Sequence, residues 1–385
     1  MSDPAQRPIY LDHHATTPCD PEVVAAMLPW FGERFGNPSS TTHIYGREAA
    51  RAVEEARAEV AALVGADPRE VVFTSGATEA LNLALKGLAA GRPAAAREAP
   101  ARVVASAFEH KAVLDVLAHG SFDAVLAPVT RDGFVALDAV AAALATPTLA
   151  VCVMAAQNEV GTLQPLAELA AMAHAAGALM LSDAAQAAGK IALDARALGV
   201  DLMALSAHKL YGPKGIGALV VRRRPPVPLV AMIDGGGHER GLRSGTLNVP
   251  AIVGFGVAAR LARERLDADQ PRIGALRDRL WAALQAGLGP RVALSGALAP
   301  RLAGNLHVSF PGLEARRLIE AVPELALSAG SACTSDDLSP SHVLRAMGLS
   351  DRDLFGSLRI GLGRGTTEAD VDLAARVLVR AVLAG

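Results

Sequence analysis

Two segments decide the fold of this 385-residue chain: Ala178-Leu-Met-Leu-Ser-Asp-Ala-Ala-Gln186 and Leu202-Met-Ala-Leu-Ser-Ala-His-Lys209. Each starts as a short apolar run and ends in polar residues, a pattern typical of a buried strand followed by a loop. Similar runs alternate with Ala-rich helical stretches at residues 71–73, 102–106, 149–154 and 217–221. Repeated βα units predict an α/β fold with a mostly parallel sheet covered by helices on both faces.

Polar residues at the strand ends define a candidate site, because ligands of such sheets bind beyond the carboxyl ends of the strands. A Lys there, such as Lys209, can hold the aldehyde of pyridoxal 5'-phosphate (PLP), while an Asp, such as Asp183, pairs with the ring nitrogen and keeps it protonated. Taken singly, a Lys or an Asp is more often an ordinary surface residue. The two together predict a PLP pocket.

Three further strand ends supply matching residues. Residues 73–79 pass from a strand through Gly76 into a helix, which presents free N–H groups to an anion, so we expect the cofactor phosphate there, near Thr78. A helix-capping role is the alternative for Thr78. Ser206 and His208 are placed to reach the same phosphate. His110 follows the strand at 102–106, where it is suited to stack on a ring and move protons. Asn158, after the strand at 149–154, is a candidate donor to cofactor or substrate.

Composition excludes several classes of protein. The chain is 51% hydrophobic with a formal net charge of −2, so it offers no basic field for nucleic acid, and the cluster at 222–224 reads as a solvated turn. No run of about 18 apolar residues occurs and residues 1–8 are polar, so we expect a cytoplasmic protein without a membrane segment. Three widely spaced cysteines suit neither a disulfide framework nor a metal site.

Cys333 lies among small polar residues at 327–337, where little side-chain material is available for a core. A thiol on such a loop can reach a bound substrate, and its thiolate is the competent nucleophile. An exposed cysteine without a role is the alternative. The polar surroundings, together with the predicted pocket, favour a nucleophile.

These motifs, in this order, resemble the class V aminotransferase-fold enzymes, and specifically the cysteine desulfurases of the NifS/IscS type. The likeness runs over nearly the whole chain. It rests on Tyr10-Leu-Asp12, Ala15-Thr-Thr-Pro18, Gly36-Asn-Pro-Ser-Ser40, 74–79, Glu109-His110-Lys111, Asn158-Glu159, Asp183-Ala-Ala-Gln186, 206–215, 235–246, Gly330-Ser-Ala-Cys-Thr334 and Leu358-Arg359.

The resemblance implies a PLP-dependent transferase of fold type I, with a large domain at 15–260 and a small α+β domain from 1–14 and 261–385. The small domain would carry the cysteine loop, about 327–340, of the long-loop group I branch. The implied activity is removal of sulfur from L-cysteine, giving L-alanine and a persulfide on Cys333 for an acceptor protein, as in iron–sulfur cluster assembly.

The resemblance also assigns roles to single residues in a homodimer. The implied roles are Lys209 as the Schiff-base lysine and base, His110 stacked on the ring, Asp183 on the ring nitrogen, Gln186 on the phenolate oxygen, the Ala77 backbone with Thr78, Ser206 and His208 on the phosphate, Thr246 on the partner's phosphate, and Arg359 with Asn158 on the substrate carboxylate.

Other functions remain open on the sequence. A selenocysteine lyase or aminotransferase-like enzyme would share the fold and cofactor, and a sulfur-relay docking partner would have weak turnover of its own. Housekeeping family members carry a C-terminal tail that docks a scaffold protein, whereas this sequence ends at Gly385. The acceptor is therefore left open among iron–sulfur assembly, nitrogenase maturation, tRNA thiolation and DNA phosphorothioation.

Overall fold

The computed structural model describes residues 7–329 and 341–385, so Cys333 and most of its predicted loop lie outside the described residues. The main feature is a seven-stranded sheet in the order β2-β8-β7-β6-β5-β3-β4. Its strands are β2 (Val71–Thr74), β3 (Ala101–Ser106), β4 (Phe122–Ala127), β5 (Ala150–Cys152), β6 (Leu179–Asp183), β7 (Leu202–Ser206) and β8 (Gly217–Val221).

The sheet is mostly parallel, as predicted. β8 pairs antiparallel with both β2 and β7, so the other six strands run in one direction and end at one edge. The six apolar runs of the sequence correspond to β2, β3, β5, β6, β7 and β8 within a few residues. β4 was not predicted, because it is an edge strand whose side chains are mostly exposed or half-buried and so was not recognised as a buried apolar run.

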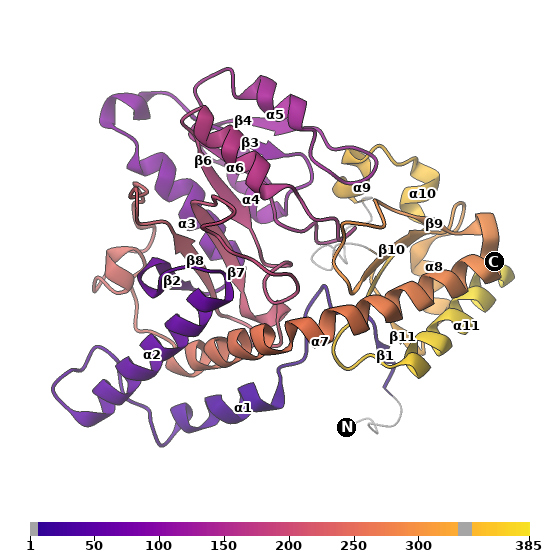
Figure 1. The fold of residues 1–385 in the computed structure, drawn as a ribbon, viewed down its shortest axis with the longest axis horizontal. Coiled ribbons are helices and arrows are strands. Elements are labelled where there is room, and N and C mark those ends of the chain that lie inside the picture. Colours follow the sequence, from indigo (N-terminus) through magenta and orange to yellow (C-terminus); the bar gives the residue numbers. More distant parts are fainter. Residues whose placement is uncertain (1–6, 330–340) are drawn as a thin grey trace.

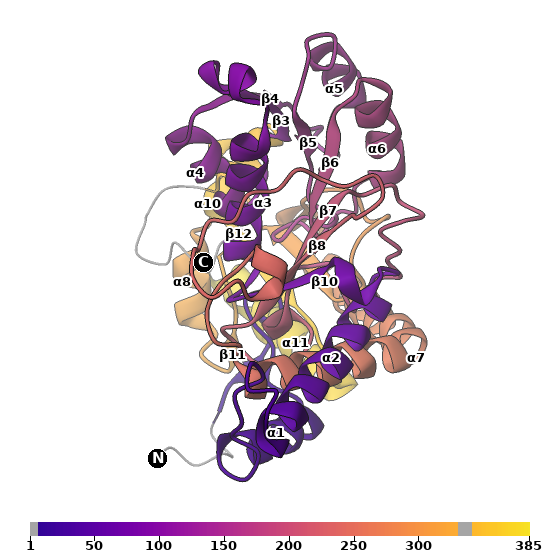
Figure 2. The same cartoon turned by 90° about the vertical axis from the view of Figure 1, so that its left-hand side faces the viewer.

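Helices cover both faces of this sheet, and Figure 2 shows α3 and α4 on one side and α5 and α6 on the other. Side chains of β7 alternate between the two sides: Leu202 and Ala204 pack under α3 and α4, whereas Met203 and Leu205 face the other core. This alternation explains why the strand reads as a continuous apolar run. The helices of this part are α1 (Pro21–Met27), α2 (Ile44–Leu63), α3 (Ala77–Gly91), α4 (Lys111–His119), α5 (Leu137–Ala143) and α6 (Leu166–Ala175).

A separate apolar core is reached along the 40-residue helix α7 (Val249–Leu288), which runs across the molecule in Figure 1. Its first half packs in the core beside the large sheet, through residues such as Phe255, and its second half enters the other core at Ile273. The remaining elements are β1 (Ile9–Tyr10), β9 (Ala293–Leu294), β10 (Asn305–Ser309), α8 (Ala315–Ala321), β11 (Leu325–Ala326), α9 (His342–Ala346), α10 (Asp351–Phe355), β12 (Ser357–Gly361) and α11 (Glu368–Ala384).

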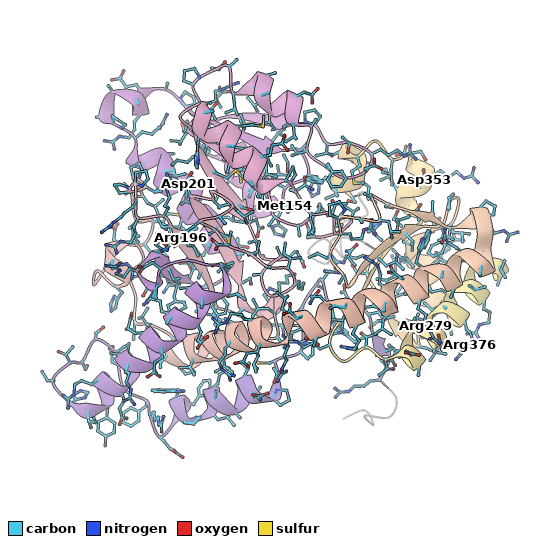
Figure 3. All side chains as sticks on the ribbon, viewed as in Figure 1. Met154, Arg196, Asp201, Arg279, Asp353 and Arg376 are labelled. Atoms are coloured by element: carbon cyan, nitrogen blue, oxygen red, sulfur yellow. The ribbon has the colours of Figure 1, made fainter. Side chains whose placement is uncertain are left out.

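Two small sheets build this second region, one of β12, β10 and β9 and one of β1 and β11. α7 and α11 pack together there, and Arg279 of α7 pairs with Asp372 and Glu368 of α11 on the outer side, near the labels Arg279 and Arg376 in Figure 3. The domain boundary at residues 260 and 261 stays a prediction. No helix in the described ranges is long and apolar enough to span a membrane.

Candidate functional site

Lys209 closes the short 3-10 turn after β7, at the edge where the parallel strands end. Its Nζ donates to the backbone oxygens of His14 (2.6 Å) and Ala15 (2.8 Å). The segment after β1 therefore lies over the end of β7. A chain segment far away in the sequence thus completes the surroundings of the predicted lysine.

Asp183 is the last residue of the neighbouring strand β6 and is buried. Its Oδ1 accepts a hydrogen bond from Ala185 N (2.9 Å). Burial raises the pKa of this carboxyl, while the positive fields of His110 and Lys209 act in the opposite direction. A buried carboxylate whose charged form is stabilised by a nearby cation is suited to pair with a protonated ring nitrogen.

Gln186 follows on the same turn and is also buried. Its Nε2 donates to His14 O (2.9 Å), and its Oε1 lies 3.2 Å from His14 Nδ1 and 3.1 Å from Lys190 Nζ. Gln186 and Lys209 thus share one backbone acceptor, the carbonyl of His14. This contact brings two of the predicted cofactor residues together.

The predicted phosphate turn has the expected form. Gly76 is the N-cap of the 15-residue helix α3 at a φ of 157° and provides no side-chain cap, which leaves the first-turn N–H groups around Ala77 for an anion. A Cβ on Gly217 of β8 would lie 2.6 Å from Gly76 Cα, so glycine is needed for this close approach.

Thr78 and His110 line the same open pocket of about 430 Å³ between α3 and α4. His110 caps α4, since its Nδ1 accepts a hydrogen bond from Ala112 N (3.1 Å). The other ring nitrogen, Nε2, is then the one that carries the proton of a neutral imidazole. Thr78 follows β2 and His110 follows β3, two strands that are not neighbours in the sheet. The packing of α3 with α4 brings the predicted phosphate and ring contacts to one side of the site.

Ser206 and His208 flank the turn that holds Lys209. Ser206 is buried at the end of β7, and His208 Nδ1 lies 3.1 Å from Thr16 Oγ1. Burial, followed by the positive charge of Lys209, lowers the pKa of His208 to about 4. The imidazole is therefore neutral at physiological pH and acts as a hydrogen-bonding group, not as a cation.

Arg359 lies in β12 and is 2% exposed. One terminal nitrogen donates to Asp12 Oδ1 (2.9 Å) and the other to the backbone oxygen of Asn158 (3.1 Å). Its Nε is buried and has no hydrogen-bond partner among the described residues. The predicted substrate pair, Arg359 and Asn158, is thus in contact, through the backbone oxygen of Asn158.

Two predicted site residues, Thr246 and Cys333, are not seen in contact with the other predicted site residues. Thr246 is exposed on the connection from β8 to α7 and makes no hydrogen bond to the other predicted residues within the described ranges. Cys333 lies outside them. Its flanks are anchored at the site: Arg359 N donates to Ser328 O (2.8 Å), and Ser341 Oγ donates to Glu159 Oε2 (2.6 Å).

Sequence reasoning missed several polar residues of the site. Asp12 was part of a quoted motif without a role, His14 stood between two quoted motifs, and Lys190 follows Gln186 by four residues. Buried Glu109 and Glu159 were also given no role; burial raises the pKa of both, that of Glu109 to about 8. The signal available for Lys190 was its place in Gln186-Ala-Ala-Gly-Lys190, next to the cofactor turn.

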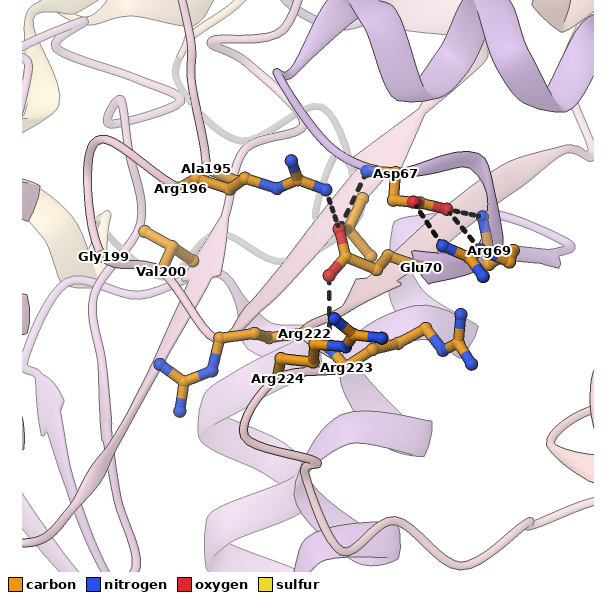
Figure 4. Close-up of a pocket in the computed structure, with 11 residues that line it drawn as sticks. Asp67, Arg69, Glu70, Ala195, Arg196, Gly199, Val200, Arg222, Arg223 and Arg224 are labelled. Carbon is orange, nitrogen blue, oxygen red and sulfur yellow. Dashed lines mark hydrogen bonds and ion pairs between the residues drawn. The ribbon is translucent and has the colours of Figure 1, made fainter.

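A second open pocket, of about 540 Å³, lies at the opposite edge of the sheet (Figure 4). Arg222 pairs there with Asp201, Arg196 pairs with Glu70, and the backbone N–H of Arg223 donates to Glu70. The arginine run is therefore partly tied to carboxylates. In the described part of the chain, no group of three or more His, Cys, Asp or Glu residues could hold a metal ion.

The residues that the structure brings together fit PLP. A helix start without a side-chain cap matches the phosphate, a buried carboxylate matches the ring nitrogen, and Lys209 lies on the next strand end beside that carboxylate. The hydroxyl of Thr78 and the imidazole of His110 share a pocket on the same side.

Comparisons with known proteins agree with this geometry. The family model described as aminotransferase class-V matches residues 9–373. "Cysteine desulfurase IscS" of Anaeromyxobacter sp. (strain Fw109-5) is 50% identical over 378 residues, covering 97% of this chain and 92% of that protein. "Cysteine desulfurase, mitochondrial" of Arthroderma benhamiae is 46% identical and covers 97% and 74%.

Solved structures give the same result. A chain titled "NIFS-LIKE PROTEIN" superposes with a TM-score of 0.88 at 35% identity, covering 97% of this chain and 98% of that chain. DndA from Streptomyces lividans has a TM-score of 0.76 at 37% identity and covers 92% and 100%. The chain belongs to the class V aminotransferase family and, within it, to the PLP-dependent cysteine desulfurases.

Proposed function

We propose that this chain removes the sulfur of L-cysteine and releases L-alanine, with Lys209 as the cofactor lysine and Cys333 as the sulfur acceptor. The observation that carries the proposal is the contact of Lys209 and Gln186 with one carbonyl, that of His14, next to the buried carboxylate of Asp183. A solved structure titled "SspA in complex with cysteine" is 33% identical, with a TM-score of 0.80 over 92% of this chain.

The roles follow from the positions. Bound PLP supplies an electron sink for the bonds broken at the substrate. Arg359 and Asn158 hold the substrate carboxylate; the guanidinium, whose Nε has no partner in the described part of the chain, supplies charge and direction. Lys209 takes the Cα proton at its Nζ once the substrate has displaced it. His110, with its Nε2 proton, exchanges protons near the substrate.

Sulfur transfer requires the Cys333 thiolate to attack the substrate sulfur. A sulfur–sulfur bond forms while the substrate carbon–sulfur bond breaks, and its electron pair stays with the carbon fragment, which gains protons and leaves as alanine. Support comes from the two flanks, because Ser328 is bonded to Arg359 and Ser341 to Glu159. These contacts place the described residues on either side of the cysteine segment next to Arg359 and Glu159.

A homodimer is part of the proposal. Around α1 and the start of α2 the surface exposes several large apolar side chains, and clusters of this kind often mark interfaces. We propose that a second copy of this chain covers this surface, because Thr246 can reach the cofactor phosphate of another subunit only in a dimer. The exposed apolar residues are Leu28, Phe31, Phe35, Ile44 and Tyr45.

The trans role of Thr246 is testable by mixing two damaged variants. Thr246→Ala and Lys209→Ala each lose activity alone, but a hybrid dimer contains one site with an intact lysine and the partner's intact Thr246. Unfolding and refolding the mixture is then expected to restore about a quarter of the wild-type activity per dimer by random pairing. No recovery, with dimers present in sedimentation, would place Thr246 in its own subunit's site or outside both.

The destination of the sulfur is also proposed. The relatives named IscS favour delivery to an acceptor protein for iron–sulfur cluster assembly.

The cytoplasm is the proposed location, and the free thiols of Cys19 and Cys152 suit a reducing compartment. A selenocysteine lyase or aminotransferase-like activity, or a docking protein with weak turnover, remains the alternative.

One assay separates these functions. Purified protein is given L-cysteine, and alanine and sulfide are measured beside Cys333→Ala and Lys209→Ala. We expect alanine release that needs both residues, with the visible cofactor band retained in Cys333→Ala and lost in Lys209→Ala. Turnover of selenocysteine that does not need Cys333, without turnover of cysteine, would favour the lyase; a bound cofactor with neither activity would contradict the proposal.

A further inference from the structure

The Gln186 amide can occupy its site in two orientations related by a flip, and its neighbours decide between them. One end of the amide faces the carbonyl oxygen of His14, which requires an N–H donor. The other end faces both His14 Nδ1 and Lys190 Nζ. An ammonium group is only a donor, so Lys190 requires the oxygen of Gln186 at that end.

The imidazole ring of His14 would not fix this orientation by itself. Its Nε2 lies 3.3 Å from Gly304 O and its Nδ1 lies 3.2 Å from Gln186 Oε1, so both ring nitrogens face acceptors. Burial, with the positive fields of Lys190 and Arg359, lowers the pKa of His14 well below its usual value, and the neutral ring carries one proton for two acceptors. If the proton is on Nε2, it is donated to Gly304 O, and the bare Nδ1 would favour a flipped amide that turns its NH₂ group to the ring. Lys190 opposes that flip because it needs the amide oxygen at the same end.

Lys190 is held close to the cofactor lysine as well. Both lysines line a cavity of about 20 Å³ below the turn after β7, room for about one water molecule. Burial, followed by the charges of Lys209 and Arg359, lowers the pKa of Lys190 to about 7, so the ammonium form, which can only donate to Gln186, predominates below that pH. The other titratable or charged groups that line this cavity are His13, His14, Tyr211, Asp269 and Arg364.

We propose that Lys190 is a positioning residue that holds the Gln186 amide with its oxygen turned to Lys190 and its nitrogen turned to the cofactor. Of the two N–H groups on Nε2, one is bonded to His14 O, which leaves the second for the phenolate oxygen of PLP. Donation by Lys190 to Oε1 also polarises the amide and makes Nε2 a stronger donor. The inference rests on the proposed function, because it takes Gln186 as a cofactor contact.

Loss of Lys190 has two expected consequences that do not depend on turnover. PLP binds to the protein less tightly, by about tenfold, because one charge-supported hydrogen bond is weakened. The visible absorbance of the bound cofactor titrates about one pH unit higher, because a nearby cation and a donor to the phenolate both favour the deprotonated linkage to Lys209.

The experiment compares Lys190→Met, Lys190→Arg and the exposed-site control Arg316→Met on α8. The readouts are the PLP dissociation constant by equilibrium dialysis and the pH titration of the visible band of the loaded protein. We expect both shifts in Lys190→Met, most of the wild-type behaviour in Lys190→Arg, and no change in Arg316→Met. Lys190→Gln, which lacks the charge, takes the place of Lys190→Met if that variant does not fold.

A double-mutant cycle with Gln186→Leu shows whether Lys190 acts through the amide. If it does, Lys190→Met raises the PLP dissociation constant by less than twofold when Gln186 is already changed to Leu. Wild-type constants and titration in Lys190→Met, or full additivity in the cycle, would overturn the inference. Alanine release by the wild-type protein is measured in parallel, so that a failure of the proposed function is seen independently of these shifts.

Discussion

A terminal guanidinium nitrogen of Arg359 lies 2.9 Å from Asp12 Oδ1, across 347 residues of sequence. The arginine is 2% exposed and the Asp12 side chain is 17% exposed, so the contact is largely shielded from water. Asp12 neutralises the buried cation while leaving its Nε without a described partner. Under the proposed function, the carboxylate of a substrate would meet an arginine that is already oriented by another carboxylate.

The first prediction concerns Arg359 itself. Arg359→Lys keeps the charge but loses the planar, two-pronged donor geometry that matches a carboxylate. We expect the KM for L-cysteine to rise about tenfold to a hundredfold, equivalent to about 1.4–2.8 kcal/mol, with a smaller effect on kcat. Steady-state alanine release measures it, with Arg376→Lys on the exposed side of α11 as the control. An unchanged KM would remove Arg359 from the substrate contacts.

The second prediction concerns Asp12. Asp12→Asn leaves the guanidinium of Arg359 without its counter-charge, which we expect to lower the free energy of unfolding by about 2 kcal/mol, less than for a fully buried pair because Asp12 is partly exposed. A carboxylate ligand then replaces the missing charge. L-Alanine, which lacks the sulfur, is therefore expected to raise the Tm of the variant more than that of the wild type. Equal shifts in thermal unfolding would show that ligand and Asp12 do not share the arginine.

The third prediction concerns the connection that carries Thr246. Glu239 accepts two hydrogen bonds of 2.7 Å from Arg57 and another from Phe73 N, with both side chains buried. Arg243 of the same connection pairs with Glu79 beside the phosphate turn. These contacts hold the connection against β2 and α3, and so they fix the surface from which Thr246 projects.

Because Glu239→Gln leaves Arg57 as a buried and poorly compensated charge, we expect it to cost about 3 kcal/mol in the free energy of unfolding. Urea unfolding measures this cost. Glu54 pairs with the same arginine but is 66% exposed, so Glu54→Gln is the matched control and is expected to cost less than about 0.5 kcal/mol. Similar costs for the two variants would show that burial does not decide the strength of this pair.

Strand ends made much of the site predictable. Asp183 and Lys209 close two apolar runs that are adjacent in the sheet, so a parallel arrangement alone brings them to one edge. The contact of Asp12 with Arg359 was not predictable in this way, because it depends on β12 and the segment after β1 meeting across a second core. Lys190 was missed for another reason: a lysine in a turn is normally solvated, and only the packing of His14 against Gln186 reveals its contact.

The last prediction uses pH. His307 of β10 is fully buried, neither ring nitrogen has a described partner, and burial with the charges of Arg301 and Arg359 lowers its pKa to about 3. Between about pH 6.5 and 3 the unfolded chain binds a proton that the native ring does not, so the stability that His307 contributes falls as the pH falls, by about 1.4 kcal/mol per pH unit. His307→Leu removes this loss and is expected to gain about 2 kcal/mol relative to the wild type between pH 7.5 and 5 in urea unfolding. The exposed His119, changed to Gln, serves as the control and should show no such gain. Parallel pH profiles for wild type and His307→Leu would mean that the buried ring is already protonated or hydrated in the native protein.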